Sequence, residues 1–393
     1  MTAWAMLAER DGLESVHGGP GPGGLAEGVV DFSVNVNPFG PAPAAAEAWI
    51  RADPVSYPDP SSLAAREAAA RLWNIDMASV RFSGGATSLL HDVALAWIEP
   101  GSVGVVPEPS FAEYARAVML ARGRVVRVPP ADHTGSLDID GTLRAAWDFD
   151  ARMVFLGRPN TPTGEVVDDD MLAMLVAGLP ERCLLVLDES FLSFHAGTVA
   201  AGPALTVTPR VLAVRSVTKD CGLAGLRAGF AVGPAGVLAA LDRVSRPWSA
   251  SAPAQAAARA SLMPESVAYL DLTLRRLASE TEAIVCAVAA AGLEPRRSRT
   301  NFFCARVPGT VQAGAGSRDD SSGVAAEALA TALDAEGLRV RRCGSFGMPG
   351  YLRIGARLPE QNRRLITALN ALMPAPGRPV SRSPTPSDSL RRP

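Results

Sequence analysis

Lysine is almost absent from this sequence. Its 38 basic residues comprise a single lysine, Lys219, and 37 arginines (38 − 1). Arginine can replace lysine as a solvated charge or an ion-pair partner but not as a reactive amine, because a guanidinium stays protonated. Retention of this one lysine favours a Schiff-base role, and the alternative is a surface lysine left by chance in a chain biased toward Ala, Arg, Gly and Pro. The residues around Lys219 are needed to distinguish a Schiff-base lysine from a surface lysine.

Other features are also missing, and each absence argues against a class of protein. The formal net charge is −2 without a basic run, which argues against nucleic acid or an anionic membrane as the main partner. No apolar run approaches the roughly 20 residues that span a bilayer, and the N-terminus carries acids where a signal peptide is basic and then apolar. We therefore expect a cytoplasmic protein. The five cysteines include no C-x-x-C pair, which predicts reduced packing residues and no metal site.

The middle of the chain alternates helical and strand patterns. Candidate helices such as 61–73 have apolar residues at three- and four-residue spacing. Short apolar runs, including CLLVLDES and RVLAVRS, lie between them. This interleaving predicts an α/β fold with a mostly parallel sheet wrapped by helices. The expected divisions are an N-terminal arm (1–45), a large domain (46–250), a smaller C-terminal α+β domain (251–373) and a disordered tail (374–393).

Ligands of such sheets bind at the carboxyl ends of the strands, so the residues that end the strand patterns are candidates for a site. SGGAT (83–87) presents backbone N–H groups to a phosphate, Asp188 ends an apolar strand, and Lys219 follows two hydroxyl residues. Each alone has an ordinary explanation as a turn, a helix cap or a backbone partner. Together with Arg227 they supply an amine for an aldehyde, an acid for a pyridine nitrogen and a phosphate cup. Pyridoxal 5'-phosphate (PLP) needs this combination.

From about residue 15 to 373 the sequence resembles the fold-type I PLP enzymes of the class I/II aminotransferase superfamily. Within that superfamily it resembles in particular the cobalamin-pathway L-threonine-O-3-phosphate decarboxylases and the histidinol-phosphate aminotransferases. The motifs that carry the resemblance are SGGAT, PSFAEYARA, PNTPTG, LDESF, SVTKDCGLAGLRAGF and YLRIGARLPEQN, while HGG and DFSVNVNPFGP favour the decarboxylase branch. The resemblance implies a seven-stranded, mostly parallel sheet in a large PLP-binding domain, and a homodimer with shared active sites.

The resemblance also implies roles for individual residues. Lys219 would hold PLP as a Schiff base and then transfer a proton, and Asp188 would pair with the pyridinium nitrogen. Phe111 would cover the cofactor ring, with core packing as the alternative. The other cofactor-binding candidates are Gly85, Ala86, Thr87, Asn160, Thr161, Ser216, Thr218 and Arg227, with Tyr57 reaching across a dimer interface. The substrate-binding candidates are Arg353 for a substrate anion such as a carboxylate and, as weaker candidates for a phosphate, Arg341, Asn35 and His17.

Two positions depart from the pattern of the superfamily. Thr161 stands where these enzymes usually have an asparagine that contacts the phenolic oxygen of the cofactor, and Phe191 lacks the hydroxyl that many aminotransferases place near that oxygen. A threonine hydroxyl donates one hydrogen bond and cannot supply the same pair of contacts. These departures leave open which bond at the substrate α-carbon is broken.

The resulting hypotheses are three. The main expectation is a threonine-phosphate-decarboxylase-like PLP enzyme that acts at the α-carbon of an anionic amino acid, such as a phosphorylated one. The alternative is an aminotransferase of the histidinol-phosphate type, or a diverged PLP enzyme of a specialised biosynthetic pathway. A non-enzymatic regulator that keeps the fold for effector binding is disfavoured, because every residue that the cofactor chemistry needs is present.

Overall fold

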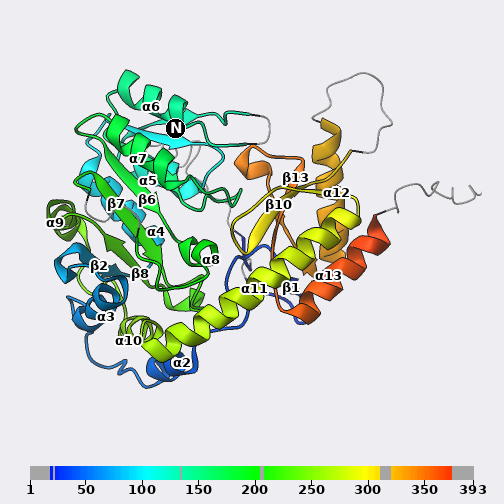
Figure 1. Cartoon of the computed structure of the whole chain (residues 1–393), viewed down its shortest axis with the longest axis horizontal. Coiled ribbons are helices and arrows are strands. Elements are labelled where there is room, and N and C mark those ends of the chain that lie inside the picture. Colours follow the sequence, from blue (N-terminus) through cyan, green and yellow to red (C-terminus); the bar gives the residue numbers. More distant parts are fainter. Residues whose placement is uncertain (1–17, 21–22, 133–134, 204–207, 310–319, 374–393) are drawn as a thin grey trace, which may run out of the picture.

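The computed structural model describes residues 18–20, 23–132, 135–203, 208–309 and 320–373. The predicted tail from residue 374 and the candidate residue His17 lie outside these ranges. The described chain forms a large sheet with its helices and a smaller sheet with its own helices, which stand on the left and right of Figure 1.

The large sheet has seven strands in the order β2-β8-β7-β6-β5-β3-β4. Along the chain they are β2 (Val80–Ser83), β3 (Val103–Pro107), β4 (Arg124–Val128), β5 (Met153–Gly157), β6 (Leu184–Asp188), β7 (Val211–Ser216) and β8 (Gly229–Val232). Neighbouring strands are parallel, except that β8 runs antiparallel to both β2 and β7. The predicted α/β fold with a mostly parallel sheet is confirmed. Because β8 is antiparallel to both β2 and β7, β2 runs in the same direction as β7 and the other parallel strands. The carboxyl ends of β2, β6 and β7 therefore lie at the same edge of the sheet.

Helices cover both faces of this sheet. They are α2 (Pro43–Ile50), α3 (Leu63–Trp73), α4 (Ala86–Trp97), α5 (Ala112–Leu120), α6 (Ile139–Asp148), α7 (Asp169–Gly178), α8 (Leu192–Ala196), α9 (Ala235–Val244) and α10 (Ala252–Ser261). On one face α4, α5 and α9 share a core with Phe155 and Val186, and on the other α6 and α7 pack on Val154 and Leu185. Successive residues of a strand point to opposite faces, so β5 and β6 are buried on both sides. This explains their continuous apolar sequences.

The smaller sheet has the strand order β12-β13-β10-β9. Its strands are β9 (Glu294–Pro295), β10 (Phe302–Arg306), β12 (Arg341–Arg342) and β13 (Tyr351–Gly355), and the helices around it are α11 (Pro264–Ala290), α12 (Asp320–Ala335) and α13 (Pro359–Leu372). Helix α11 runs from beneath the large sheet, near α10, to the small sheet (Figure 1). An apolar core joins α11, α12 and α13 to β10 and β13.

One predicted strand is divided in the structure. The pattern LRVRRC (338–343) contains β11 (Leu338–Arg339), which pairs with β1 (Val30–Asp31), and β12, which pairs with β13. Through its pairing with β11, the β1 strand of the N-terminal segment, which was predicted as an extended arm, forms a two-stranded parallel sheet beside the small sheet (Figure 1). Buried Val340 separates the two short strands and packs in the core beneath them.

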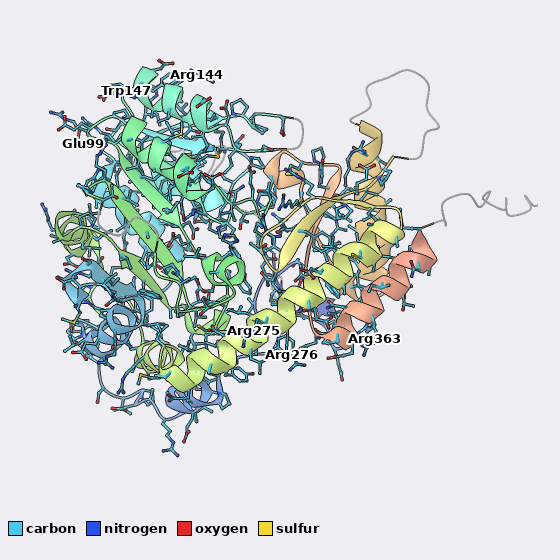
Figure 2. The ribbon with its side chains drawn as sticks, viewed as in Figure 1. Glu99, Arg144, Trp147, Arg275, Arg276 and Arg363 are labelled. Atoms are coloured by element: carbon cyan, nitrogen blue, oxygen red, sulfur yellow. The ribbon has the colours of Figure 1, made fainter. Side chains whose placement is uncertain are left out.

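The outer surfaces are rich in charge. Arg275 on α11, Arg363 on α13 and Arg144 on α6 point away from the body of the protein (Figure 2), whereas the guanidinium of Arg276 lies over the Phe39 ring, 4.7 Å from its centre. All five cysteines are free thiols, four of them buried. Among the described residues, none of the helices combines the length and apolar character required to cross a bilayer.

Candidate active site

A cavity of about 500 Å³ lies where the carboxyl edge of the large sheet faces the small sheet. The predicted site residues that line it are Asn35, Ala86, Thr87, Phe111, Thr161, Asp188, Ser216, Thr218, Lys219, Arg227, Arg341 and Arg353. Gly85 and Asn160 are the chain neighbours of lining residues without lining the cavity themselves, and Tyr57 lies away from it on the surface. The fold therefore gathers residues from both sheets and from the N-terminal segment around Lys219.

The start of α4 forms a cup at one end of the cavity. Gly85 precedes the helix with φ 109°, and as the N-cap residue it has no side chain to bind the free N–H groups of the first turn. A Cβ on Gly85 would lie only 3.1 Å from Nη2 of Arg227, so glycine allows the guanidinium to approach the helix N-terminus. Backbone N–H groups, the helix dipole and an arginine together suit a phosphate. The hydroxyls of Ser216 and Thr218, 2.5 Å apart, line the same cavity.

Asp188 is held at the carboxyl end of β6. Its Oδ2 accepts a hydrogen bond of 2.9 Å from the Tyr114 hydroxyl, and its Oδ1 accepts one of 3.0 Å from the backbone N–H of Ser190. Burial, the adjacent Asp188 charge and this hydrogen bond raise the pKa of Tyr114 well above its usual 10, so the phenol remains a donor. The carboxylate is thereby aimed into the cavity, as pairing with a pyridinium nitrogen requires.

Sequence reasoning did not single out Tyr114. The residue is 2% exposed, and its ring stacks on Phe155 with centroids 5.3 Å apart. It also meets the edge of Phe111 at 5.7 Å. A signal was present, because Tyr114 follows Phe111 by the three-residue spacing that puts two side chains on one side of a helix. Its contact with Asp188, however, spans 74 residues of chain.

Lys219 projects into the cavity between groups of both signs. Burial lowers its pKa from 10.5 to about 8, the nearby Arg227 and Arg353 add to the effect, and Asp188 opposes it. The lowered pKa makes the unprotonated amine more abundant near neutral pH than it is in an ordinary lysine. Nζ donates no hydrogen bond to another residue in the described part of the chain and lies 6.0 Å from the centre of the Phe191 ring. The amine is therefore placed to react with a carbonyl group.

Two residues of the PNTPTG motif, Asn160 and Thr161, have different positions: Asn160 supports the loop and Thr161 lines the cavity. Nδ2 of Asn160 donates to the carbonyl oxygen of Pro109 at 2.9 Å and to the Thr163 hydroxyl at 3.0 Å. Thr161 lines the cavity and Asn160 does not. Both amide hydrogens of Asn160 are thus used to hold the loop, whereas the Thr161 side chain is the one exposed to a ligand.

Two arginines of the small sheet line the cavity. Arg341 and Arg353 are direct cross-strand partners on β12 and β13 and are 8% and 6% exposed. Nη2 of Arg353 donates to Ser33 O at 2.8 Å, and its buried Nε has no hydrogen-bond partner among the described residues. Nη2 of Arg341 donates to the Ser345 hydroxyl at 2.7 Å. Adjacent guanidiniums repel, so the pair is suited to an anion that bridges them.

The three remaining predicted residues, Asn35, Tyr57 and His17, differ from one another in their position relative to the cavity. Asn35 lines the cavity, and its backbone carbonyl accepts a hydrogen bond of 3.2 Å from Asn301. Tyr57 is 79% exposed and stacks on Trp248 at 4.5 Å, so within this one chain it does not reach the phosphate cup. His17 lies outside the described residues, although its neighbours Gly18 and Gly19 line the cavity.

The sheet topology, with a lysine, a carboxylate and a phosphate cup meeting at the strand ends, defines a fold-type I PLP-dependent enzyme. The chain belongs to the aminotransferase class I and II family, whose model matches residues 27–369. The resemblance expected from the motifs, the enzymatic character and the PLP cofactor are thereby confirmed.

Individual relatives agree with this assignment. The histidinol-phosphate aminotransferase of Symbiobacterium thermophilum is 34% identical over 349 residues, which is 88% of this chain and 91% of the relative. A crystal structure of the enzyme of that name from Sinorhizobium meliloti, in complex with PLP, superposes with a TM-score of 0.77 at 28% identity over 86% of this chain and 89% of the other. The L-threonine-O-3-phosphate decarboxylase of Porphyromonas gingivalis shares the fold, with a TM-score of 0.69 at 24% identity over 86% of this chain and 98% of the other.

Proposed function

We propose that this enzyme is an aminotransferase of the histidinol-phosphate type. The observation that carries the proposal is the pair Arg341 and Arg353, two buried guanidiniums in the same cavity as Lys219. Such a pair matches the charge of a phosphate dianion. The similarity to histidinol-phosphate aminotransferases, at 34% identity for that of Symbiobacterium thermophilum, supports this alternative better than the decarboxylase-like expectation, since the decarboxylase shares only the fold at 24% identity.

The residues present fit PLP. The cup formed by Ala86, Thr87 and Arg227 would hold its phosphate, and the hydroxyls of Ser216 and Thr218 would add donors. Gly85 supports this role because a Cβ there would crowd Arg227. These residues come from the large-sheet side of the cavity, and Arg341 and Arg353 on the small sheet would be available for the substrate.

Asp188, Phe111 and Lys219 would serve the rest of the cofactor. Asp188, held by Tyr114, would keep the pyridine nitrogen protonated, and Phe111 would cover the ring. Bound PLP supplies an electron sink for the carbon that bears the substrate amino group. The amine of Lys219 would take the proton from that carbon, a task that suits a group with a pKa near 8.

The choice of bond follows from the substrate. Histidinol phosphate has no carboxylate on the carbon that bears its amino group, so the C–H bond is the one that Lys219 can act on. Holding the phosphate at Arg341 and Arg353 fixes the far end of the substrate, which orients that bond toward the lysine. In a decarboxylase the carboxylate would have to take the place of this hydrogen.

A substrate comparison tests the proposal. The purified PLP-loaded enzyme is offered histidinol phosphate or O-phospho-L-threonine, each with 2-oxoglutarate as amino acceptor. We expect glutamate to form with histidinol phosphate and no carbon dioxide from phosphothreonine. Release of carbon dioxide from phosphothreonine without formation of glutamate would establish the decarboxylase-like function instead.

We further propose that two copies of the chain form a homodimer with shared sites. Tyr57 stacks on Trp248, which is 47% exposed, and the chain just before Tyr57 carries two further exposed apolar side chains: Val55 is 91% exposed and Ile50 73%. Exposed aromatic and aliphatic residues of this kind are typical of the buried centre of an interface. The position of Tyr57 at this surface supports the expectation that it would complete the phosphate cup of a second subunit.

A further inference from the structure

The peptide that follows Lys219 is held by a residue from the N-terminal segment. The backbone N–H of Asn37 donates to the carbonyl oxygen of Lys219 at 2.8 Å. Its side-chain Nδ2 donates to the carbonyl oxygen of Asp220 at 3.0 Å, across 183 residues of sequence. One residue therefore binds two successive carbonyl groups, and in doing so it restricts the peptide planes on both sides of Asp220.

Asn37 is itself rigidly placed. It is 2% exposed, Nδ2 also donates to the Thr273 hydroxyl at 2.8 Å, and Oδ1 accepts from the backbone N–H of Phe39 at 3.1 Å. The Thr273 hydroxyl in turn donates to Leu270 O at 2.7 Å within α11. A buried amide whose polar groups are all hydrogen-bonded has a fixed orientation. Asn37 can therefore fix the backbone of residues 219–222, which we call the lysine loop.

The lysine loop also approaches the N-terminal segment closely at Gly222. Gly222, three residues after the lysine, approaches Gly40 so tightly that a Cβ on it would lie 2.7 Å from the Gly40 carbonyl carbon. On the opposite side, the carboxylate of Asp220 accepts a 2.6 Å hydrogen bond from Ser193, at the start of α8. The lysine loop is thus held between α8 and the N-terminal segment.

The same N-terminal segment extends from the lysine to the substrate end of the cavity. Ser33 O accepts the hydrogen bond from Arg353, and Asn35 O accepts one from Asn301. Residues 33–37 therefore run from the anion-binding arginine to the carbonyl of the lysine. This continuity places Asn37 where it can set the distance between the amine and the rest of the site.

We infer that Asn37 is a positioning residue for the amine of Lys219, which acts by holding the Lys219–Asp220 backbone through its main-chain and side-chain hydrogen bonds. This inference rests on the proposed role of Lys219 as the residue that bonds to PLP. Correct placement of the amine matters for its covalent capture of the aldehyde, in which a carbon–nitrogen bond forms and one water leaves. It does not matter for binding of the phosphate by the cup.

The test compares two ligands that differ only at the reacting carbon. PLP has an aldehyde that Lys219 can capture, whereas pyridoxamine 5'-phosphate has the same ring and phosphate without the aldehyde. Apoenzymes of the parent, Asn37→Ser and Asn37→Asp are titrated with each ligand, and the ratio of the two dissociation constants is measured. We expect both variants to bind PLP about tenfold more weakly, the equivalent of one buried hydrogen bond lost at about 1.4 kcal/mol. Binding of pyridoxamine 5'-phosphate stays within about twofold of the parent.

Asn301→Ser is the matched control. Asn301 is also 2% exposed and also donates Nδ2 to a carbonyl of the same segment, at 3.2 Å, but at Asn35 rather than at the lysine loop. We expect this variant to melt at a lower temperature, as the Asn37 variants do, and to keep the ratio of the parent. An unchanged ratio in both Asn37 variants, or equal weakening of both ligands, would overturn the inference while leaving the proposed function intact.

Lys219→Ala separates the two proposals. If the parent binds PLP no more tightly than Lys219→Ala does, the role of Lys219 is wrong and the inference about Asn37 fails with it. If the parent binds PLP more tightly than Lys219→Ala does, and the preference for PLP over pyridoxamine 5'-phosphate falls about tenfold in both Asn37 variants but not in Asn301→Ser, both proposals are supported. The two Asn37 variants guard against misfolding, because aspartate preserves the volume of the side chain and serine leaves room for water.

Discussion

Replacement of Arg353 by alanine should separate substrate recognition from cofactor binding. The guanidinium is 6% exposed, lines the cavity and has a buried Nε without a partner among the described residues. An anion held by this group forms charge-assisted hydrogen bonds in a closed site, and the loss of such a pair costs about 2–5 kcal/mol. At 1.4 kcal/mol per tenfold, kcat/KM for a phosphorylated amine should fall by about 30- to 4,000-fold.

The structure predicts a smaller cost in stability for the same variant. Arg353→Ala leaves Ser33 O without its donor, which should lower the free energy of unfolding by about 1–3 kcal/mol. Binding of pyridoxamine 5'-phosphate to the apoenzyme should be retained, because the phosphate cup is built from residues of the large-sheet side and does not include Arg353. Arg353→Lys keeps the charge but not the planar fork, so it should recover only part of the lost activity.

Arg342→Ala is the matched control for this prediction. Arg342 follows Arg341 on β12, but its side chain forms ion pairs with Glu327 at 2.7 Å and Asp334 at 2.9 Å on the surface. Such pairs contribute about 0–1 kcal/mol to stability, and kcat/KM should be unchanged. Steady-state kinetics and thermal melting of the three variants provide the assay. The reasoning is refuted if Arg353→Ala turns over substrate within a few-fold of the parent.

Three other predictions follow from the site. Borohydride reduction of the PLP-loaded enzyme should place the label on the Lys219 peptide, and its appearance on another peptide would refute the assignment. The rate at which the apoenzyme captures PLP should rise with pH to a half-maximum near pH 8, because the amine with a pKa of about 8 must lose its proton to react, and a pH-independent rate between pH 7 and 9 would contradict this. In mixtures of inactive Tyr57→Phe and Lys219→Ala subunits, one site of the hybrid dimer is intact, so partial activity should return; no recovery despite demonstrated subunit exchange would argue against shared sites.

Much of the fold and cofactor site could be predicted from the sequence. Apolar runs such as that ending at Asp188 are long enough for a strand and too short for a helix, and their continuity indicates burial on both faces. Because parallel strands end at one edge, Asp188 and Lys219 could be placed together without knowledge of the strand order. Lys219 was identifiable because it is the single lysine beside 37 arginines (38 − 1), and only a primary amine can form an imine.

Contacts between distant segments could not be predicted, because local spacing carries no information about them. Nothing near Tyr114 indicates that its hydroxyl meets Asp188, and nothing near Asn37 indicates that it holds the backbone beyond Lys219. Cross-strand pairing likewise decides that Arg341 lies opposite Arg353. In LRVRRC (338–343) one apolar pattern predicted one strand, and only the packing around buried Val340 divided it between two sheets.

The amine of Lys219 shows the same difference between what the sequence determines and what the tertiary structure determines. The sequence by itself determined that an amine is available at position 219 and that no other lysine can replace it. The pKa of that amine was decided by the tertiary structure, because burial and the charges of Arg227 and Arg353 lower it to about 8. Arg227 precedes β8 of the large sheet and Arg353 belongs to β13 of the small sheet. The size of their effect depends on their distances from the amine through space rather than along the chain.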